Sequence, residues 1–197
     1  MMTPLGTVAE VSTGYPFRKK VETEEGGDIV LVQIKDFGGA EGVTASGSVM
    51  LRNQQGKYER YLLQTGDLLF QSRGSRYPVA VVGRGIRGIA AAGLYVIRPN
   101  PERVVARYLA WWLSHPNSQA KIRDDLARGT YIPFVSKRAL EGFLVALPSL
   151  EVQRRIVEVD ELQAREHYLR FRLGELTQQL GDGVTLAAAT RKRSRNN

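Results

Sequence analysis

Five arginine side chains with no acidic residue among them are the first feature of this chain that could do chemistry. They fall between Leu68 and Pro101, a stretch without aspartate or glutamate. A guanidinium group can hold a phosphate with two parallel hydrogen bonds, or bind O6 and N7 of guanine. The stretch therefore predicts a DNA-binding face, although a solvated basic surface fits the composition equally well. The five are Arg73, Arg76, Arg84, Arg87 and Arg98.

A second group combines aromatic rings with cations in residues 14–20, GYPFRKK. Such a loop suits contacts to the DNA backbone and to exposed sugars or bases. We expect Lys35 and the loop over residues 128–137 to extend the same surface. Arg73, Ser75 and Arg76 are the primary candidates for DNA contacts, and the secondary ones are Tyr15, Phe17, Arg18, Lys20, Lys35, Arg128, Thr130, Tyr131 and Ser136.

Catalytic and cofactor motifs are weak. Asp28 with Gln33 and Lys35 has the residue types of a metal-dependent nuclease, but the second carboxylate that would complete a metal site is missing. Residues 83–88, GRGIRG, have the spelling of a dinucleotide-binding turn, yet the segment after them is too short for a crossover helix. Cysteine is absent and histidine occurs twice, which argues against zinc sites and thiol chemistry. We expect no catalytic residue, no metal and no cofactor.

Charge and composition narrow the class of partner. The chain has 197 residues, a formal net charge of +8 and a pI near 9.9. Nucleic acid, an anionic membrane surface and acidic proteins are therefore the first partners to consider. No segment approaches the roughly 18 apolar residues of a membrane helix, and the N-terminus lacks the pattern of a signal peptide. We expect a soluble cytoplasmic protein with no membrane partner.

The first hundred residues predict the sheet that must position these loops. Short β-like runs alternate with glycine-rich turns, which is typical of a twisted mixed sheet whose loops carry recognition residues. The expected strands cover residues 8–12, 29–34, 58–63, 68–72, 79–82 and 94–97.

Two helices are expected after this sheet. Pro101 at a first helical position and apolar residues at helical spacing up to Trp112 predict a helix with one buried face, which stops at His115. A second helix is expected from Asn117 to a C-cap at Gly129. We expect the tryptophans in the core rather than stacked on bases.

A strand over residues 143–147 is followed by a break at Pro148 and then by a long helix. Apolar residues repeat every seven positions along this helix, which is the pattern of a coiled-coil seam. An amphipathic helix folded back on its own domain is the alternative. One series is Val152, Val159, Glu166, Leu173 and Leu180, and the other is Leu162, Leu169 and Leu176, with Glu166 and Arg155 as polar exceptions. We expect the helix pair to be held by Leu162, Leu169, Leu173 and Leu176.

The sequence thus predicts an α+β protein with one well-cored domain and an appendage. We expect a globular domain over residues 1–148, with a twisted mixed sheet and a few helices. A long coiled-coil helix for dimerisation is expected over residues 149–181. Residues 182–197 contain small residues and a basic run and are expected to form a disordered tail.

Seven segments, in order and at matching spacing, make the chain resemble the specificity subunits of type I restriction-modification systems. They cover nearly the whole chain, from about residue 5 to residue 180. The segments are LGxVAEVSTGYPF (5–17), VQIKD (32–36), LQTGDLLFQSRGS (63–75), YLAWWLSHP (108–116), GTxIP (129–133), LVALP (144–148) and ExQRRIV (151–157).

This resemblance implies a target recognition domain followed by a helical conserved region. Members commonly have two such blocks, whose helices pair antiparallel so that each domain reads one half of a bipartite DNA site. This chain has one block and resembles a half-subunit, so we expect a homodimer that reads an inverted-repeat site. The expected partners are double-stranded DNA and adenine methyltransferase (modification) subunits; an endonuclease or translocase subunit as a further partner is left open.

The chain departs from the family pattern in its expected recognition loops. Phe134 stands where the family often has a polar residue, and Arg76-Tyr77-Pro78 replaces the usual glycine-containing turn. Two other functions remain as alternatives. One is a basic coiled-coil interaction protein without sequence-specific DNA binding, and the other is a small metal-dependent nuclease that uses Asp28 and Lys35.

Overall fold

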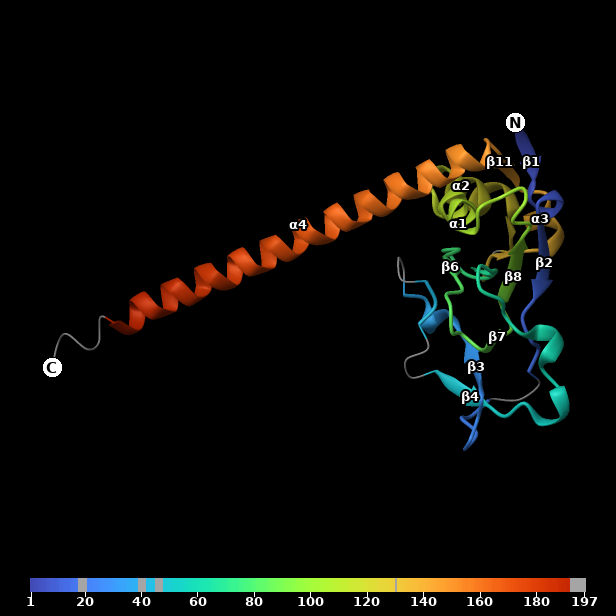
Figure 1. Ribbon diagram of the computed structural model, residues 1–197, viewed down its shortest axis with the longest axis horizontal. Helices are drawn as coiled ribbons and strands as arrows, with labels where there is room; N and C mark the ends of the chain where they lie inside the picture. The colour runs from blue at the N-terminus through green and yellow to red at the C-terminus, as the bar shows by residue number, and fades with distance from the viewer. Residues whose placement is uncertain (18–20, 39–41, 45–47, 130, 192–197) are drawn as a thin grey trace. The chain divides into compact units, whose positions relative to one another are not determined.

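The computed structural model describes residues 1–17, 21–38, 42–44, 48–129 and 131–191, and for Arg191 only the backbone. The chain divides into two compact units, Met1–Val157 and Glu158–Asn197. Strands and short helices form the first unit, and the second contains most of one long helix (Figure 1).

A four-stranded antiparallel sheet is the centre of the first unit. Its order is β2 (Ala9–Thr13), β8 (Leu94–Pro99), β5 (Leu68–Gln71) and β6 (Val79–Val81). Successive side chains of a strand point to opposite faces. Leu68 and Phe70 of β5 accordingly enter one buried cluster with the short helices, whereas Leu69 enters a second cluster on the other face. The sheet therefore has a core on each side.

A smaller sheet lies at the other end of this unit from β1 and β11 (Figure 1). Its order is β4 (Val49–Leu51), β3 (Ile29–Val32) and β7 (Gly88–Ala90). The pairing of β3 with β4 is antiparallel and that of β3 with β7 is parallel. The expected mixed sheet and α+β class are thus confirmed.

Short elements complete the first unit. Strand β1 (Met2–Pro4) pairs with β11 (Leu144–Ala146), and β9 (Ala127–Arg128) pairs with β10 (Phe134–Val135). The helices are α1 (Ala106–Ser114), α2 (Pro116–Lys121) and α3 (Lys137–Glu141), with a π-helical turn η6 (Ile122–Leu126) after α2. Single 3-10 turns cover η1 (Leu5–Thr7), η2 (Ile34–Asp36), η4 (Gln54–Gly56) and η5 (Glu59–Tyr61).

Three expected elements differ from the structure. The strand expected over residues 58–63 is mainly the 3-10 turn η5, and the helix expected from Pro101 begins at Ala106. The helix expected up to Gly129 ends at Leu126, because residues 127–128 form a strand instead. Gly129 has a φ of +104°, as a C-cap glycine would, but it turns the chain from β9 towards β10.

Helix α4 (Leu150–Arg191) is fixed to the first unit by a buried glutamine. The Gln153 side chain is 0% exposed. Its Oε1 accepts from the backbone N–H of Val105 at 2.9 Å, and its Nε2 donates to the carbonyl oxygens of Arg103 at 3.2 Å and Pro148 at 2.9 Å. Ile156 packs against the core one turn further on. The start of the helix therefore belongs to the compact domain.

Replacing Gln153 with alanine should lower the free energy of unfolding by about 3 kcal/mol, because three part-buried hydrogen bonds to the backbone are lost. Urea denaturation of the full chain, followed by circular dichroism, measures this loss. Gln163→Ala is the matched control, since Gln163 is an exposed glutamine of the same helix and its removal should change stability by less than about 0.5 kcal/mol. Equal losses for both variants would contradict the structural role of Gln153.

Beyond Val157, α4 is a continuous helix that continues to Arg191. The disordered tail expected from residue 182 is therefore wrong for residues 182–191, and residues 192–197 lie outside the described part. Leu162, Leu169, Leu173 and Leu176 are between 48% and 65% exposed. Ion pairs one turn apart, such as Glu166 with Arg170 at 2.8 Å, stabilise the helix locally. The leucine series is thus a solvent-exposed apolar stripe in this chain.

Candidate nucleic-acid interface

The loop between β5 and β6 carries the three primary candidates. Arg73, Ser75 and Arg76 are all exposed. Tyr77 anchors the loop in the core, since it is 1% exposed and stacks on Phe70 with ring centroids 5.9 Å apart. Within the described residues, neither Arg73 nor Arg76 forms an ion pair with an acidic side chain. The fold therefore presents two cationic groups from a firmly attached loop.

The β9–β10 hairpin lies directly against this loop. Gly74 N donates to the carbonyl of Pro133 at 2.9 Å, and Val135 N donates to that of Ser72 at 2.8 Å. The Arg73 guanidinium carbon lies 5.9 Å from the centre of the Phe134 ring, within the range of a cation–π contact. The Arg73 loop and the β9–β10 hairpin, which the sequence both predicted to contact DNA, are thus neighbours. Phe134, which departs from the family pattern, packs against the guanidinium group of Arg73.

The secondary candidates on this hairpin have different surroundings. Arg128 is exposed, and Tyr131 is 98% exposed. Ser136 caps helix α3, since its Oγ accepts from the backbone N–H of Ala139 at 3.2 Å. The sequence reasoning missed this capping role. Thr130 lies outside the described residues, as do Arg18 and Lys20.

Tyr15 and Phe17 belong to an aromatic cluster that packs on the smaller sheet. Their ring centroids are 4.6 Å apart, and Tyr15 also contacts Tyr58 at 5.1 Å and Tyr61 at 4.9 Å. Both candidates are half-buried, so most of each ring serves packing. Lys35 is exposed on the turn η2.

Two cationic side chains that were not predicted as site residues lie over tyrosine rings of the aromatic cluster. Lys57 Nζ lies 5.0 Å from the centre of the Tyr58 ring, and the Arg60 guanidinium carbon lies 4.9 Å from that of Tyr61. A hydrogen bond to the side chain of Tyr58 raises the pKa of Lys57 above its ordinary value, so this amine stays charged. A cation directly before each tyrosine in residues 57–61, KYERY, was the sequence feature that could have indicated these contacts.

One short segment, residues 90–93, connects the two candidate groups. On one side Tyr15 N donates to the carbonyl of Ala90 at 2.8 Å, and on the other Ser72 N donates to that of Gly93 at 2.9 Å. Gly14 is required here, because a Cβ at this position would lie 2.1 Å from the carbonyl oxygen of Ala91. The aromatic cluster and the Arg73 loop are therefore attached to the same short segment.

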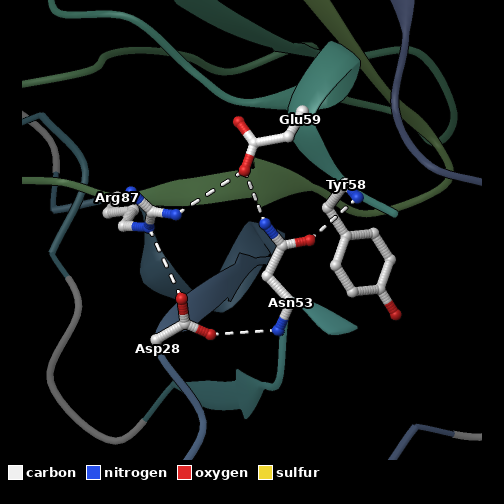
Figure 2. A network of polar contacts seen from close by, with 5 residues as sticks. All are labelled: Asp28, Asn53, Tyr58, Glu59 and Arg87. Carbon is white, nitrogen blue, oxygen red and sulfur yellow. Dashed lines mark hydrogen bonds and ion pairs between the residues drawn. The ribbon is translucent and has the colours of Figure 1, made fainter. Parts of the chain in front are cut away.

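Two arginines of the acid-free stretch form ion pairs with acidic residues that lie outside this stretch. Arg98 forms a two-pronged ion pair with Asp67, whose side chain is 1% exposed, with nitrogen–oxygen distances of 2.8 and 2.7 Å. Arg87 lies 3.7 Å from both Asp28 and Glu59 (Figure 2). The stretch is therefore less free for phosphate binding than its composition predicts.

The acidic residue of the nuclease alternative, Asp28, takes part in structural contacts. Asp28 contacts Arg87 and also accepts from the backbone N–H of Asn53 at 3.0 Å, while Asn53 Nδ2 donates to Glu59 at 2.6 Å (Figure 2). Within the described ranges, no three histidine or acidic side chains converge on a common point. Over the same residues, no helix is long and apolar enough to cross a membrane.

A match to a known family decides what this fold represents. The model of the type I restriction modification DNA specificity domain matches residues 1–159. The chain belongs to this family. The match confirms the resemblance that the sequence motifs predicted. Members of this family are non-catalytic specificity subunits.

Solved structures of specificity subunits share the fold. The HsdS subunit from Thermoanaerobacter tengcongensis matches 86% of this chain with a TM-score of 0.60 and 22% identity, and 38% of that chain is covered. The type I S subunit from M. genitalium matches 82% with a TM-score of 0.55 and 13% identity, and again 38% is covered.

A chain from a study of complex assembly and conformational transition of the type I R-M system matches 86% of this chain with a TM-score of 0.64 and 22% identity, covering 39% of its own length. This specificity-family chain thus spans about two fifths of the length of the solved structures it matches. No curated protein was found to be similar to it.

The buried anchor of the Arg73 loop contains a hydroxyl group whose removal should stabilise the protein. Tyr77 Oη has no hydrogen-bond partner among the described residues, and its burial raises the pKa of Tyr77. Tyr77→Phe should raise the free energy of unfolding by about 1 kcal/mol, because an unsatisfied buried hydroxyl is removed. Tyr108→Phe should lower it by a similar amount, since Tyr108 Oη donates to the carbonyl of Ala146 at 2.7 Å. Thermal and urea unfolding would measure both; a loss of stability in Tyr77→Phe contradicts the prediction.

Proposed function

We propose that this chain is a half-length DNA-reading subunit of a type I restriction-modification system. The observation that carries the proposal is the pairing of the exposed arginine loop with the β9–β10 hairpin, in a member of the DNA specificity family. Arginines on rigidly held loops can bind phosphates and guanine edges at fixed positions. Residues 1–148 serve as the target recognition domain, and no reaction is assigned to the chain itself.

Homodimerisation through α4 is the second part of the proposal. Leu162, Leu169 and Leu176 at seven-residue spacing, together with Leu173 of the second series, are exposed and are expected to pair with the same stripe of a second copy. Antiparallel pairing would give a two-fold dimer that reads an inverted repeat with an unspecified spacer. Because the 42 residues of α4 span about 63 Å at 1.5 Å per residue, the spacer is at most about 18 base pairs.

Modification subunits are the proposed protein partners. A similar chain comes from a study of how a type I R-M system assembles, and this supports assembly here as well. We expect the dimer to position adenine methyltransferase subunits on its site in the cytoplasm. An endonuclease subunit is a further proposed partner in systems that contain one.

A binding experiment tests sequence reading against simple charge attraction. The chain would be titrated, at several salt concentrations, into duplexes selected from a random library and into unselected duplex. We expect the selected duplex to bind at least about 1,000-fold more tightly, with both affinities falling as salt rises. Salt-dependent binding without preference would instead support the basic coiled-coil interaction protein. Cleavage of plasmid with magnesium or manganese that is lost in Asp28→Asn would support the nuclease.

A further inference from the structure

The tip of the β9–β10 hairpin exposes two large apolar side chains side by side in the sequence. Tyr131 is 98% exposed and Ile132 is 61% exposed. Phe134, which begins β10, is 43% exposed. Single exposed apolar residues are common, but a contiguous group of this kind on a loop usually marks a contact surface. A partner molecule is therefore expected to cover the tip.

The tip stands on a firmly held base. Backbone hydrogen bonds join Gly74 to Pro133 and Val135 to Ser72, and the Tyr95 hydroxyl donates to the carbonyl of Val135 at 2.9 Å. Val135 is fully buried. A rigid base reduces the entropy lost when the tip is inserted into a partner. The hairpin is thus built to present its tip rather than to adapt its shape.

The charges around the tip favour a polyanion over an apolar protein surface. Arg73 contacts the base of the hairpin through Phe134, and Arg128 and Arg138 are exposed at its two ends. The nearby carboxylates are partly neutralised, since Glu141 pairs with Lys137 at 3.6 Å and Asp124 with Arg123 at 2.9 Å. Asp125 is the exposed acid that remains in the adjoining turn η6. Cations therefore outnumber unpaired acids here.

We propose that Tyr131 and Ile132 form a wedge that enters the DNA base stack within each half-site and opens one base step. Apolar side chains inserted in this way unstack neighbouring base pairs and bend the duplex. The inference rests on the proposed DNA-reading function and adds its mode of contact. An opened step also lowers the energy needed to extrude a nearby base, as a methyltransferase acting on that base requires.

Fluorescence of 2-aminopurine, placed in turn at each position of the selected half-site, tests this wedge directly. The probe brightens when it loses its stacked neighbours. With saturating full-length chain, we expect a several-fold rise at one base step, and we expect Tyr131→Ala with Ile132→Ala to abolish it. The double variant should also bind the selected duplex at least 10-fold more weakly, while its affinity for unselected duplex stays unchanged, because no phosphate contact is removed.

Two controls separate insertion from general effects. Tyr131→Phe keeps the ring and should keep the fluorescence rise. Ile34→Ala removes an apolar side chain that is 44% exposed on the turn η2, and it should behave as the unaltered chain. All of these side chains are exposed, so the variants should unfold at the temperature of the unaltered chain.

The outcomes distinguish this inference from the function on which it rests. Tight, selective binding without brightening at any position would overturn the wedge and leave the DNA-reading function intact, and so would brightening that persists in the double variant. Absence of any sequence preference in the unaltered chain would overturn the proposed function itself. A double variant that binds and unstacks DNA normally but fails to bind a modification subunit would show that the tip contacts protein.

Discussion

Leu169→Glu together with Leu176→Glu should convert a dimer of twice 21.9 kDa into a folded monomer. Both leucines are about half exposed in the single chain, so neither supports the fold of the first unit. In an antiparallel pair the substitutions place four buried carboxylates in one seam, and unpaired buried charges are strongly unfavourable. Light scattering measures the mass, and binding to the selected duplex should fall by at least 100-fold because each half-site is then bound alone.

The matched control adds the same charges to the other side of the helix. Phe171→Glu with Gln178→Glu keeps the seven-residue separation but lies on the face opposite the leucine stripe. This variant should remain a dimer. Monomeric behaviour of the unaltered chain, or dissociation by both pairs of substitutions alike, would contradict pairing through the proposed seam.

Removal of Arg73 and Arg76 together should weaken binding to the selected duplex by about 100-fold, from about 1–2 kcal/mol for each lost contact. Within the described residues both arginines lack acidic partners, so their charge is available to DNA. Both are exposed, and stability should therefore change little. Fluorescence anisotropy with selected and unselected duplexes would measure affinity and preference.

Arg154→Ala with Arg155→Ala serves as the charge-matched comparison. These two arginines are exposed in the first turns of α4, and Arg155 already pairs with Glu151 at 2.6 Å. Their removal should lower affinity for all duplexes only slightly. If both double variants lose the same affinity and neither loses preference, Arg73 and Arg76 act through net charge alone and do not read the sequence.

Short apolar runs between glycine-rich turns made most strands predictable, whereas tertiary contacts decided the exceptions. In β5, Leu68, Leu69 and Phe70 form such a run, and the structure shows that they enter different clusters on the two faces of the sheet. Residues 58–63 have similar composition but form a turn, in which Tyr58 is buried and Tyr61 packs beside it. Gly129 at positive φ is compatible with both a helix end and a hairpin, so it could not distinguish them.

The end of α4 was missed for a different reason. Small residues and a basic run after residue 181 suggested a disordered tail, and a glycine such as Gly183 lowers helix stability by about 1 kcal/mol. The helix continues through Gly183 into the alanines of residues 187–189, which are strong helix formers. A disfavoured residue reduces helix stability without ending the helix, so composition alone placed this boundary too early.

For the candidate site, the sequence indicated the residue types but not their partners. Arg73 of the β5–β6 loop contacts Phe134 of β10. These residues are far apart in the chain, so no local sequence pattern could predict the contact. Arg98 was grouped with the DNA-facing arginines because Asp67 lies one residue outside the acid-free stretch. Lys57 and Arg60 were missed because the surrounding residues were interpreted as a strand.

Selection of bound duplexes from a fully random library, followed by sequencing, tests the central claim most directly. For the full chain we predict enrichment of one short sequence in two inverted copies, separated by an unspecified spacer of constant length no greater than about 18 base pairs. Enrichment of a single half-site would contradict the symmetric dimer, and a library that remains random after repeated selection would contradict DNA reading altogether.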